Sequence, residues 1–284
     1  MPLNPSQQAV VTAEYAKLDG LRTRVATHRL YSEHPDDPDG ALFGLLRLPS
    51  ARSLLDIGCG TGEFLRSLTN AGHSGQLVGV DTSPEAVEAT AATDGVRAIE
   101  ASATDLPLPD GEFDLATARH MLYHVPDPGR ALEEARRVLR HGGTFAAIVN
   151  HPEAVPRTVA LVREVVREAG IVPAPSPLNE VHSDSLPPLV QQVFGTHEVH
   201  RFDNALVFDR PQPLAAFAAA QLSFYGVPPE AAEHAVLVQE LADRADRWFR
   251  DNHTPWRDPK GYTICTALAP QTGRSRQRGT ALEE

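Results

Sequence analysis

The sequence predicts an α/β protein built on a doubly wound parallel sheet with helices on both faces. Five short apolar runs between residues 53 and 149 alternate with helical segments. That alternation is typical of crossover connections between parallel strands. The turn after the first of these strands carries three glycines, at positions 58, 60 and 62. A glycine-rich strand–helix turn lets the backbone approach a ligand closely, so the same pattern also points to a binding site.

Composition limits what this chain can be. It has 284 residues, 42% of them hydrophobic, and a formal net charge of −11 at pH 7, so it can bury a core and lacks the broad basic face of a nucleic-acid binder. Two cysteines, Cys59 and Cys265, exclude a disulfide scaffold and a Cys-rich zinc site. Neither a long apolar run nor a signal-peptide pattern is seen. We therefore expect a cytoplasmic protein with no membrane, nucleic-acid or metal partner.

Local patterns place the elements of the first half. Residues 1–50 are expected to be polar and helical, and to end in an acidic, Pro-rich loop at 34–40. A helix should start at Ser83-Pro84, with Ser as N-cap and Pro in the first position. Another should end at Gly142-Gly143. The full set of predictions is strands at 53–57, 76–81, 97–101, 113–118 and 144–149, and helices at 63–71, from 83, and at 128–139.

The second half is less regular. Apolar residues at helical spacing predict helices near 159–169, 214–224 and 237–248, and strands are expected at 197–208 and 261–268. The resulting organisation is an N-terminal helical lid at 1–50, a cofactor-binding core at 51–210, a helical cap insertion at 211–258, a last core strand at 259–270 and a disordered tail at 271–284.

The spacing of the glycines argues against a dinucleotide fingerprint. That fingerprint needs a third glycine where this chain has Glu63. Asp56 precedes the loop, and a carboxylate there suits a cationic ligand better than a pyrophosphate. Asp81 follows Gly62 by 19 residues, at the end of the second strand. An acid at that place can accept both hydroxyls of a ribose.

These residues resemble the class I S-adenosylmethionine-dependent methyltransferases. Three further stretches are similar to family segments: 105–114, before the fourth strand; 124–128, His-Val-Pro-Asp-Pro, a turn of the subgroup that contains ubiquinone and menaquinone methyltransferases; and 137–143, before the fifth strand. The resemblance implies a Rossmann-like doubly wound sheet of seven strands, the last antiparallel, with helices on both faces and a helical cap. It implies S-adenosylmethionine as cofactor and S-adenosylhomocysteine as product.

For the methionine end of the cofactor, the resemblance implies five residues. Gly58 and Gly60 would lie against the methionine part, with the small Cys59 between them. Asp56 would help to hold the amino group, through water. Arg119, at the tip of the fourth strand, would line this end.

For the adenosine end, the resemblance implies four residues. Asp81 would take the ribose hydroxyls, with Thr82 beside the adenine. Ala103 would offer its backbone N–H to the ring. Ser102 stands where the family often has Asp, and a hydroxyl accepts the adenine amino group more weakly than a carboxylate does.

Two histidines are candidate catalytic bases. His120 and His124 follow the fourth strand, at the carboxyl edge where ligands bind in such sheets. A neutral imidazole can take the proton of a hydroxyl or ammonium acceptor. His124 has an alternative role, as a structural part of its turn. As a metal site the pair lacks a third ligand, and His151 is a third candidate at the rim.

The predicted function is methyl transfer to the oxygen, nitrogen or carbon of a small molecule, in secondary metabolism, by in-line displacement. The acceptor would lie between the N-terminal segment, with Arg24 and His28, and the cap. The cap aromatics either line that pocket or pack the cap onto the core; these are Phe217, Phe224, Tyr225, Trp248 and Phe249. The acidic residues Asp36, Asp37 and Asp39 are expected to form a solvated loop.

Three rival readings stay open. An RNA or protein methyltransferase keeps the cofactor and changes the acceptor, and a non-methylating S-adenosylmethionine-binding protein keeps the cofactor without the transfer. A nicotinamide dehydrogenase is disfavoured by Glu63. The chain is expected to be a monomer or a homodimer.

Overall fold

The computed structural model describes residues 19–46, 53–173 and 181–270. In these residues seven strands form one sheet in the order β3-β2-β1-β4-β5-β7-β6. The strands are β1 (Ser53–Ile57), β2 (Gln76–Asp81), β3 (Val96–Glu100), β4 (Phe113–Arg119), β5 (Leu139–Asn150), β6 (Glu198–Phe208) and β7 (Trp256–Leu268). Strands β1 to β5 pair in parallel, and β7 runs antiparallel to both β5 and β6. The predicted Rossmann-like sheet of seven strands, the last antiparallel, is confirmed.

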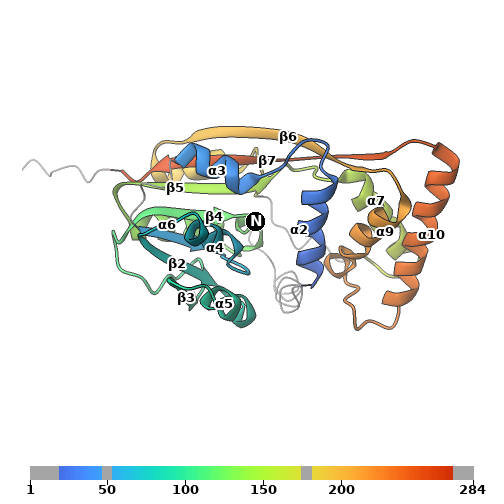
Figure 1. The fold of residues 1–284 in the computed structure, drawn as a ribbon, viewed down its shortest axis with the longest axis horizontal. Coiled ribbons are helices and arrows are strands. Elements are labelled where there is room, and N and C mark those ends of the chain that lie inside the picture. The colour runs from blue at the N-terminus through green and yellow to red at the C-terminus, as the bar shows by residue number, and fades with distance from the viewer. Residues whose placement is uncertain (1–18, 47–52, 174–180, 271–284) are drawn as a thin grey trace, which may run out of the picture.

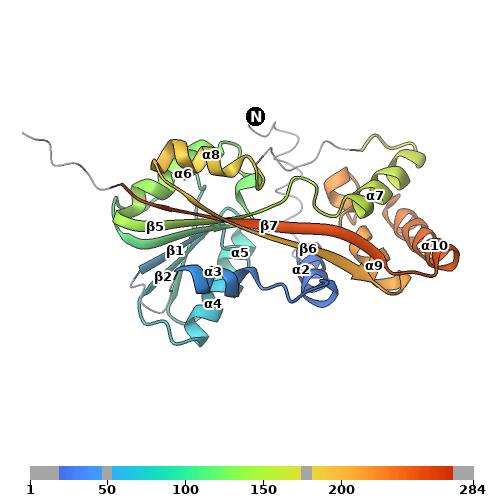
Figure 2. The same cartoon turned by 90° about the horizontal axis from the view of Figure 1, so that it is seen from above.

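Helices cover both faces of the sheet. They are α2 (Asp19–Tyr31), α3 (Pro38–Leu46), α4 (Glu63–Asn70), α5 (Pro84–Ala91), α6 (Pro128–Val138), α7 (Pro156–Glu168), α8 (Leu186–Phe194), α9 (Pro211–Ala219) and α10 (His234–Asn252), with short 3₁₀ turns η2 (Leu122–His124) and η3 (Leu222–Tyr225). Helices α3 and α4 lie on one face and α6 and α8 on the other (Figure 2). No helix in the described ranges combines the length and the apolar character that crossing a bilayer requires.

Alternate residues of each core strand pack into two different hydrophobic cores, one on each face of the sheet. On β1, Leu54 packs with Phe64 and Leu65 of α4, while Leu55 packs with Leu132 of α6. This two-residue period is what a strand buried on both faces produces. All five residues of β1 are buried, which is why the strand reads in the sequence as a continuous apolar run around one acid.

A two-stranded ribbon carries the sheet beyond the core. The β6–β7 pairing runs from Glu198 opposite Thr266 to Phe208 opposite Trp256, whereas β5 pairs β7 only from Tyr262 onward. Helices α2, α7, α9 and α10 gather at this overhanging end (Figure 1). They close around a separate apolar cluster that includes Phe217. The helical layer therefore combines the segment before β1, α7 and the segment between β6 and β7.

The predicted end of the helix at Gly142-Gly143 is wrong. Helix α6 ends at Val138, and Leu139 is already extended, with ψ 140°. The pairing of β4 with β5 jumps from Leu139 to Thr144, so residues 140–143 bulge out of the ladder. A Cβ at Gly143 would come within 2.9 Å of the Arg140 carbonyl oxygen. These glycines serve a β-bulge, which needs small residues for the same backbone reasons that a helix cap does.

Other boundaries also differ from the prediction, and two of them have a clear physical reason. Strand β7 begins at Trp256, five residues before the expected 261, because its first part pairs with β6 alone. The acidic loop expected at 34–40 ends early, since α3 starts at Pro38. Asp37 accepts a hydrogen bond from the Gly40 N–H at 2.8 Å and so caps that helix. The disordered tail predicted at 271–284 lies outside the described residues.

Candidate active site

The glycine loop follows β1 at the carboxyl edge of the sheet. Gly58, Gly60 and Gly62 have φ values of 70°, 54° and 71°, a left-handed region that favours glycine. The N–H groups of Gly58 and Cys59 both donate to the Val80 carbonyl oxygen, at 2.7 and 3.0 Å. A Cβ at Gly58 would lie 2.7 Å from Met121, whereas a Cβ at Gly60 would meet nothing within 4 Å. Gly58 is thus packed, and Gly60 faces open space.

Asp81 joins the ends of β1 and β2. One carboxylate oxygen accepts the Gly60 N–H at 2.9 Å, and the other accepts the Ser83 N–H at 3.0 Å. Ser83 in turn caps α5 by accepting the Ala86 N–H at 3.2 Å. A carboxylate oxygen has two acceptor positions. The backbone therefore fixes the orientation of Asp81 and leaves one acceptor position on each oxygen.

Asp56 lies behind Arg119. Its carboxyl is fully buried and accepts the Thr117 hydroxyl at 2.7 Å and Arg119 Nε and Nη2 at 3.3 and 3.0 Å. Arg119 also donates to Asp39 at 2.8 Å and lies over the Phe64 ring at 3.9 Å. Burial raises the pKa of the Asp56 carboxyl, against the opposing effects of Arg119 and Thr117. The charge expected to face a cationic ligand is thus already paired, and Arg119 is the more exposed member of the pair, with 14% of its side chain accessible.

The residues expected near the adenine lie at the ends of β2 and β3. The Ala101 N–H donates to the Asp81 carbonyl oxygen at 3.0 Å, which ties these ends together. Thr82 is exposed beside Asp81. Ala103 is buried, and the Ser102 hydroxyl lies 2.8 Å from that of Thr104. The neighbouring threonine therefore engages the serine hydroxyl.

His120 and His124 follow β4 closely. His120 has φ 52°, and its N–H donates to the Ile148 carbonyl oxygen at 2.8 Å. A left-handed histidine at a strand tip stores backbone strain, a feature that concentrates at functional sites. The His124 ring stands edge-on to Tyr123 at 4.7 Å. Burial lowers the pKa of His120 to about 4 and that of His124 to about 3, so both imidazoles are neutral at pH 7.

Two other predicted candidates are held in local contacts. The His151 ring nitrogens lie 2.5 Å from the Ser183 hydroxyl and 2.9 Å from the Asp203 carboxylate, so both are engaged at the rim. The Cys59 thiol lies 3.4 Å from the Thr90 hydroxyl, and burial raises its pKa to about 12. It is a neutral thiol that fits close packing. In the part of the chain that the structure describes, no three His, Cys, Asp or Glu side chains are grouped to hold a metal.

The expected solvated acidic loop is wrong for two of its three acids. Asp39 pairs with Arg119, and Asp36 pairs with Lys260, whose side chain is 5% exposed. Lys260 Nζ also lies 3.1 Å from His28 Nδ1. Lys260 was not among the site residues predicted from the sequence. A signal was present, because Lys260 is one of only two lysines in the chain and directly precedes the strand predicted at 261–268.

The cap aromatics mainly pack the cap. Phe217 is buried against His28 and Phe208, with ring centroids 5.7 and 6.0 Å away. Arg24 lies over the Phe224 ring at 4.5 Å. These contacts bring the inward face of α2, with Arg24 and His28, against the cap. Two polar side chains of α2 are therefore packed against the aromatic residues of the cap.

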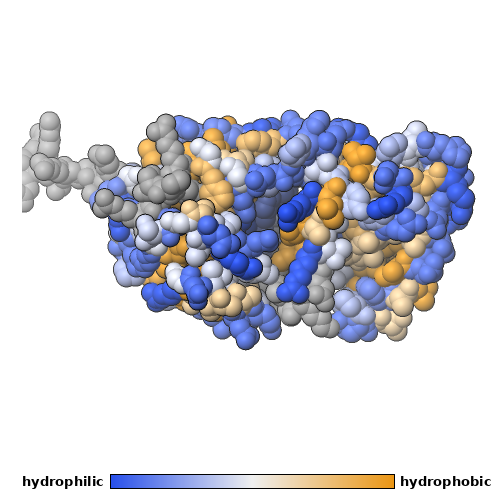
Figure 3. Space-filling view, in the orientation of Figure 1, coloured by the Kyte–Doolittle hydropathy of each residue, from blue (hydrophilic) through white to orange (hydrophobic). Residues whose placement is uncertain are grey.

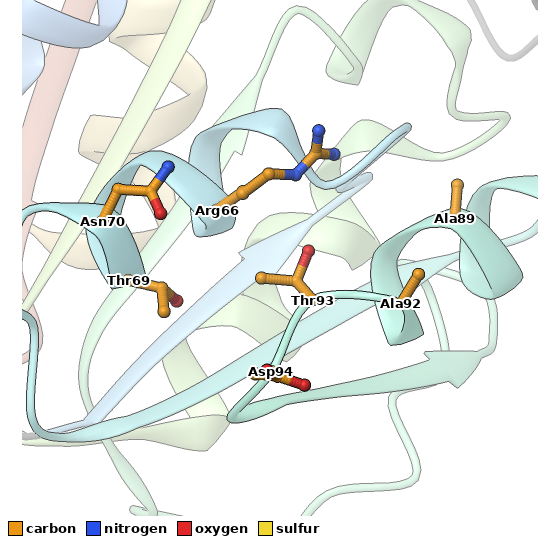
Figure 4. Close-up of a pocket in the computed structure, with 7 residues that line it drawn as sticks. All are labelled: Arg66, Thr69, Asn70, Ala89, Ala92, Thr93 and Asp94. Carbon is orange, nitrogen blue, oxygen red and sulfur yellow. The ribbon is translucent and has the colours of Figure 1, made fainter.

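A surface pocket of about 490 Å³ lies elsewhere (Figure 4). It is bordered by the C-terminal halves of α4 and α5, and its lining residues are Arg66, Thr69, Asn70, Ala89, Ala92, Thr93 and Asp94. In a parallel α/β sheet these helix ends point to the amino ends of the strands. The pocket is therefore remote from the edge where ligands bind, and we do not assign it to the active site.

Sequence comparisons match the segment that contains the glycine loop, Asp81 and His120. Residues 55–147 match a methyltransferase domain family. The chain is 36% identical over 135 residues to 27-O-demethylrifamycin SV methyltransferase of Amycolatopsis mediterranei, which covers 44% of this chain and 49% of that protein. It is 33% identical over 116 residues to a demethylmenaquinone methyltransferase of Staphylococcus saprophyticus, covering 39% and 50%. The chain thus spans half or less of the length of these curated relatives.

Solved structures share the fold over more of the chain. The YcgJ protein of Bacillus subtilis is 21% identical, with a TM-score of 0.56, and the match covers 82% of this chain and 98% of that one. The [4+2]-cyclase SpnF is 24% identical, with a TM-score of 0.57, covering 95% and 98%. At these identities the similarity concerns the fold alone.

Proposed function

We propose that this chain, which carries a class I methyltransferase domain, uses S-adenosylmethionine to methylate a small molecule. One observation carries the proposal. At the carboxyl ends of β1 and β2, the Asp81 carboxylate is held by the Gly60 and Ser83 N–H groups, beside the open space over Gly60. This arrangement suits a ribose above a glycine turn.

The residues present fit this cofactor. The space in which a Cβ of Gly60 would meet nothing within 4 Å lets a ligand approach the loop backbone. Asp81 would accept the two ribose hydroxyls, with Thr82, Ser102 and Ala103 around the adenine. Arg119 would donate to the methionine carboxylate through those of its N–H groups that do not already bond to Asp56 or Asp39. Gly58 and Cys59 would shape the loop, and Asp56 would act through Arg119.

The bound cofactor would supply an electrophilic methyl group on a sulfonium, whose sulfur would leave as a neutral thioether without acid catalysis. The protein then has to align the acceptor, exclude water and receive a proton. We propose that His120 accepts the proton of the acceptor, with His124 as its neighbour. A pKa of about 4 makes His120 a weak base in the ground state. It suffices here because an attacking hydroxyl becomes strongly acidic as its new bond to carbon forms.

A small acceptor and a role in secondary metabolism are further parts of the proposal. Support comes from the two relatives, whose names specify methylation of a rifamycin and a menaquinone precursor. The N-terminal segment would act as a lid, and the ion pairs of Asp39 with Arg119 and of Asp36 with Lys260 support this proposal. The net charge of −11 disfavours a nucleic-acid acceptor, and we expect a cytoplasmic monomer or homodimer.

Calorimetric titration with S-adenosylmethionine and S-adenosylhomocysteine tests the proposal. Wild type should bind both, and Asp81→Ala should lose at least tenfold in affinity, about 1.4 kcal/mol. Asp94→Ala, which removes an exposed acid beyond α5, is the matched control and should bind like wild type. If wild type binds neither nucleotide, the proposed function is wrong.

A non-methylating protein that binds the same cofactor is the second candidate. The fold does not decide against it, because the [4+2]-cyclase has the same architecture. Turnover separates the two functions. Methyl transfer requires that S-adenosylhomocysteine accumulates in step with a methylated product, whereas the second candidate requires cofactor binding with no transfer to any acceptor.

A further inference from the structure

We propose that the acceptor atom is the oxygen of an acidic hydroxyl, such as a phenol, recognised by Lys260, His28 and His120 between α2 and the carboxyl ends of the strands. This inference rests on the proposed function and narrows its substrate class. The space-filling view shows a hollow between the core and α2 on this face of the molecule (Figure 3).

The first step is the character of α2. Its inward side presents Arg24 and His28, one helical turn apart, where a packed helix ordinarily presents apolar residues. Arg24 is fixed by a 2.9 Å hydrogen bond from Nη1 to the Ala220 carbonyl oxygen. His28 is fixed against Phe217. A cation and an imidazole are thus turned toward the protein and held there by the cap.

The second step concerns which atoms around Lys260 donate hydrogen bonds and which accept them. An ammonium only donates hydrogen bonds, so His28 Nδ1 accepts from Lys260 at 3.1 Å. The neutral His28 ring must then carry its proton on Nε2, which makes Nε2 a donor. Asp36 balances the charge of Lys260. The group therefore offers N–H donors to an oxygen ligand.

The third step connects this group to His120. Lys260 and Tyr262 stand two residues apart on β7 and so project from the same face of the strand. The His120 ring packs edge-on against Tyr262 at 6.4 Å. A base from the β4 end and donors from β7 and α2 thus converge on one place. A hydroxyl can use both, by donating its proton to His120 and accepting from His28 or Lys260.

The fourth step is the exclusion of an amine acceptor. Three carboxylates of this region are already in ion pairs, Asp36 with Lys260 and both Asp39 and Asp56 with Arg119, while the exposed Asp37 accepts the Gly40 N–H. Burial is the main cause that lowers the pKa values of His28 and His120; Lys260 adds to it at both rings, while Asp39 and Asp36 oppose it at His120. A protonated amine bound here would meet the same penalty for burying a positive charge. A neutral hydroxyl avoids that penalty when it binds.

In the transfer, the acceptor oxygen forms a bond to the methyl carbon while the carbon–sulfur bond breaks and its electron pair stays on sulfur. The hydroxyl proton moves to His120 and then to solvent. His28 and Lys260 hold the oxygen in line and favour its ionised form. They act as positioning residues, and they should influence acceptor affinity and the pH profile rather than cofactor affinity.

The test uses the full chain, labelled S-adenosylmethionine and matched sets of phenols and benzylamines of one to three rings. Phenols should be methylated with a kcat/KM at least tenfold above that of the matched amines. Lys260→Met should raise the KM for phenols at least tenfold and shift the kcat/KM pH profile to higher pH, because the phenol loses a cationic neighbour. Lys260→Arg should restore both in part.

Arg257→Met is the matched control. Arg257 lies on the same strand and pairs with Glu33 of the same N-terminal segment, but at the surface. It should leave KM and the pH profile unchanged, and all three variants should bind the cofactor like wild type, which excludes misfolding. Preferential methylation of the amines, no transfer to any phenol despite cofactor binding, or equal behaviour of the two methionine variants would overturn the inference. Absence of cofactor binding in wild type would instead overturn the proposed function.

Discussion

The Asp56–Arg119 pair offers a quantitative test of how this site is built. Arg119→Met removes the guanidinium but keeps a side chain of similar length over Phe64. Among the described residues, the fully buried Asp56 carboxyl then keeps the Thr117 hydroxyl as its side-chain hydrogen-bond donor. Breaking a buried ion pair from one side costs ~3–5 kcal/mol because the other charge stays behind. For a chain of this size that corresponds to a drop in Tm on the order of 10 °C.

The loss should depend on pH, and its sign follows from Asp56. Burial raises the pKa of this carboxyl in the folded state, and removal of Arg119 should raise it further. A group with a raised folded-state pKa stabilises the fold when it is protonated, and that contribution is lost as pH rises through the folded pKa. The difference in stability between wild type and Arg119→Met should therefore be larger at pH 8 than at pH 5.

Urea unfolding followed by circular dichroism at both pH values measures these differences. The double variant Asp56→Asn/Arg119→Met is the control, because the neutral amide can still accept the Thr117 hydroxyl. It should recover most of the loss at pH 8. A loss below about 1 kcal/mol, the range of an exposed ion pair, or a loss equal at both pH values would refute the reasoning.

Three other outcomes are expected. Gly60→Ala should weaken cofactor binding at least tenfold, because the new Cβ enters the space over the loop. Gly72→Ala, at a glycine that is also left-handed and unobstructed, should lower the free energy of unfolding by the backbone strain of ~1–2 kcal/mol and leave cofactor affinity unchanged. Equal affinities of the two variants by calorimetry would contradict this. The pKa of His28, lowered from 6.5 to about 3, means that the unfolded chain binds more protons between these values, so stability should fall as pH drops from 7 toward 4. His28→Phe should reduce that fall in urea titrations, and an unchanged slope would count against it. Arg257→Met should change stability by less than about 1 kcal/mol, and a larger change in urea unfolding would show that this surface pair anchors the N-terminal segment.

The sequence by itself determined the parts of this protein that depend on neighbouring residues. Strands β1 and β2 have the predicted bounds because both are short apolar runs ended by a polar turn. The positive φ values of Gly58, Gly60 and Gly62 follow from residue type and from the tight turn between a strand and a helix. The position of Asp81 at the carboxyl edge of the sheet was predictable, because the chain leaves a parallel strand at that residue and the ends of such strands share one edge.

Tertiary structure decided what depends on residues far apart in the chain. Asp36 meets Lys260 across 224 positions, and Arg119 meets Asp56 across 63 and Asp39 across 80. No periodicity encodes such pairings, so the acids at 36 and 39 read locally as a solvated loop. The same holds for Gly142 and Gly143, because a helix cap and a β-bulge ask for the same residue type, and only the pairing partner distinguishes them. The glycine loop is thus local in origin, while the groups proposed to receive the acceptor are assembled by the fold.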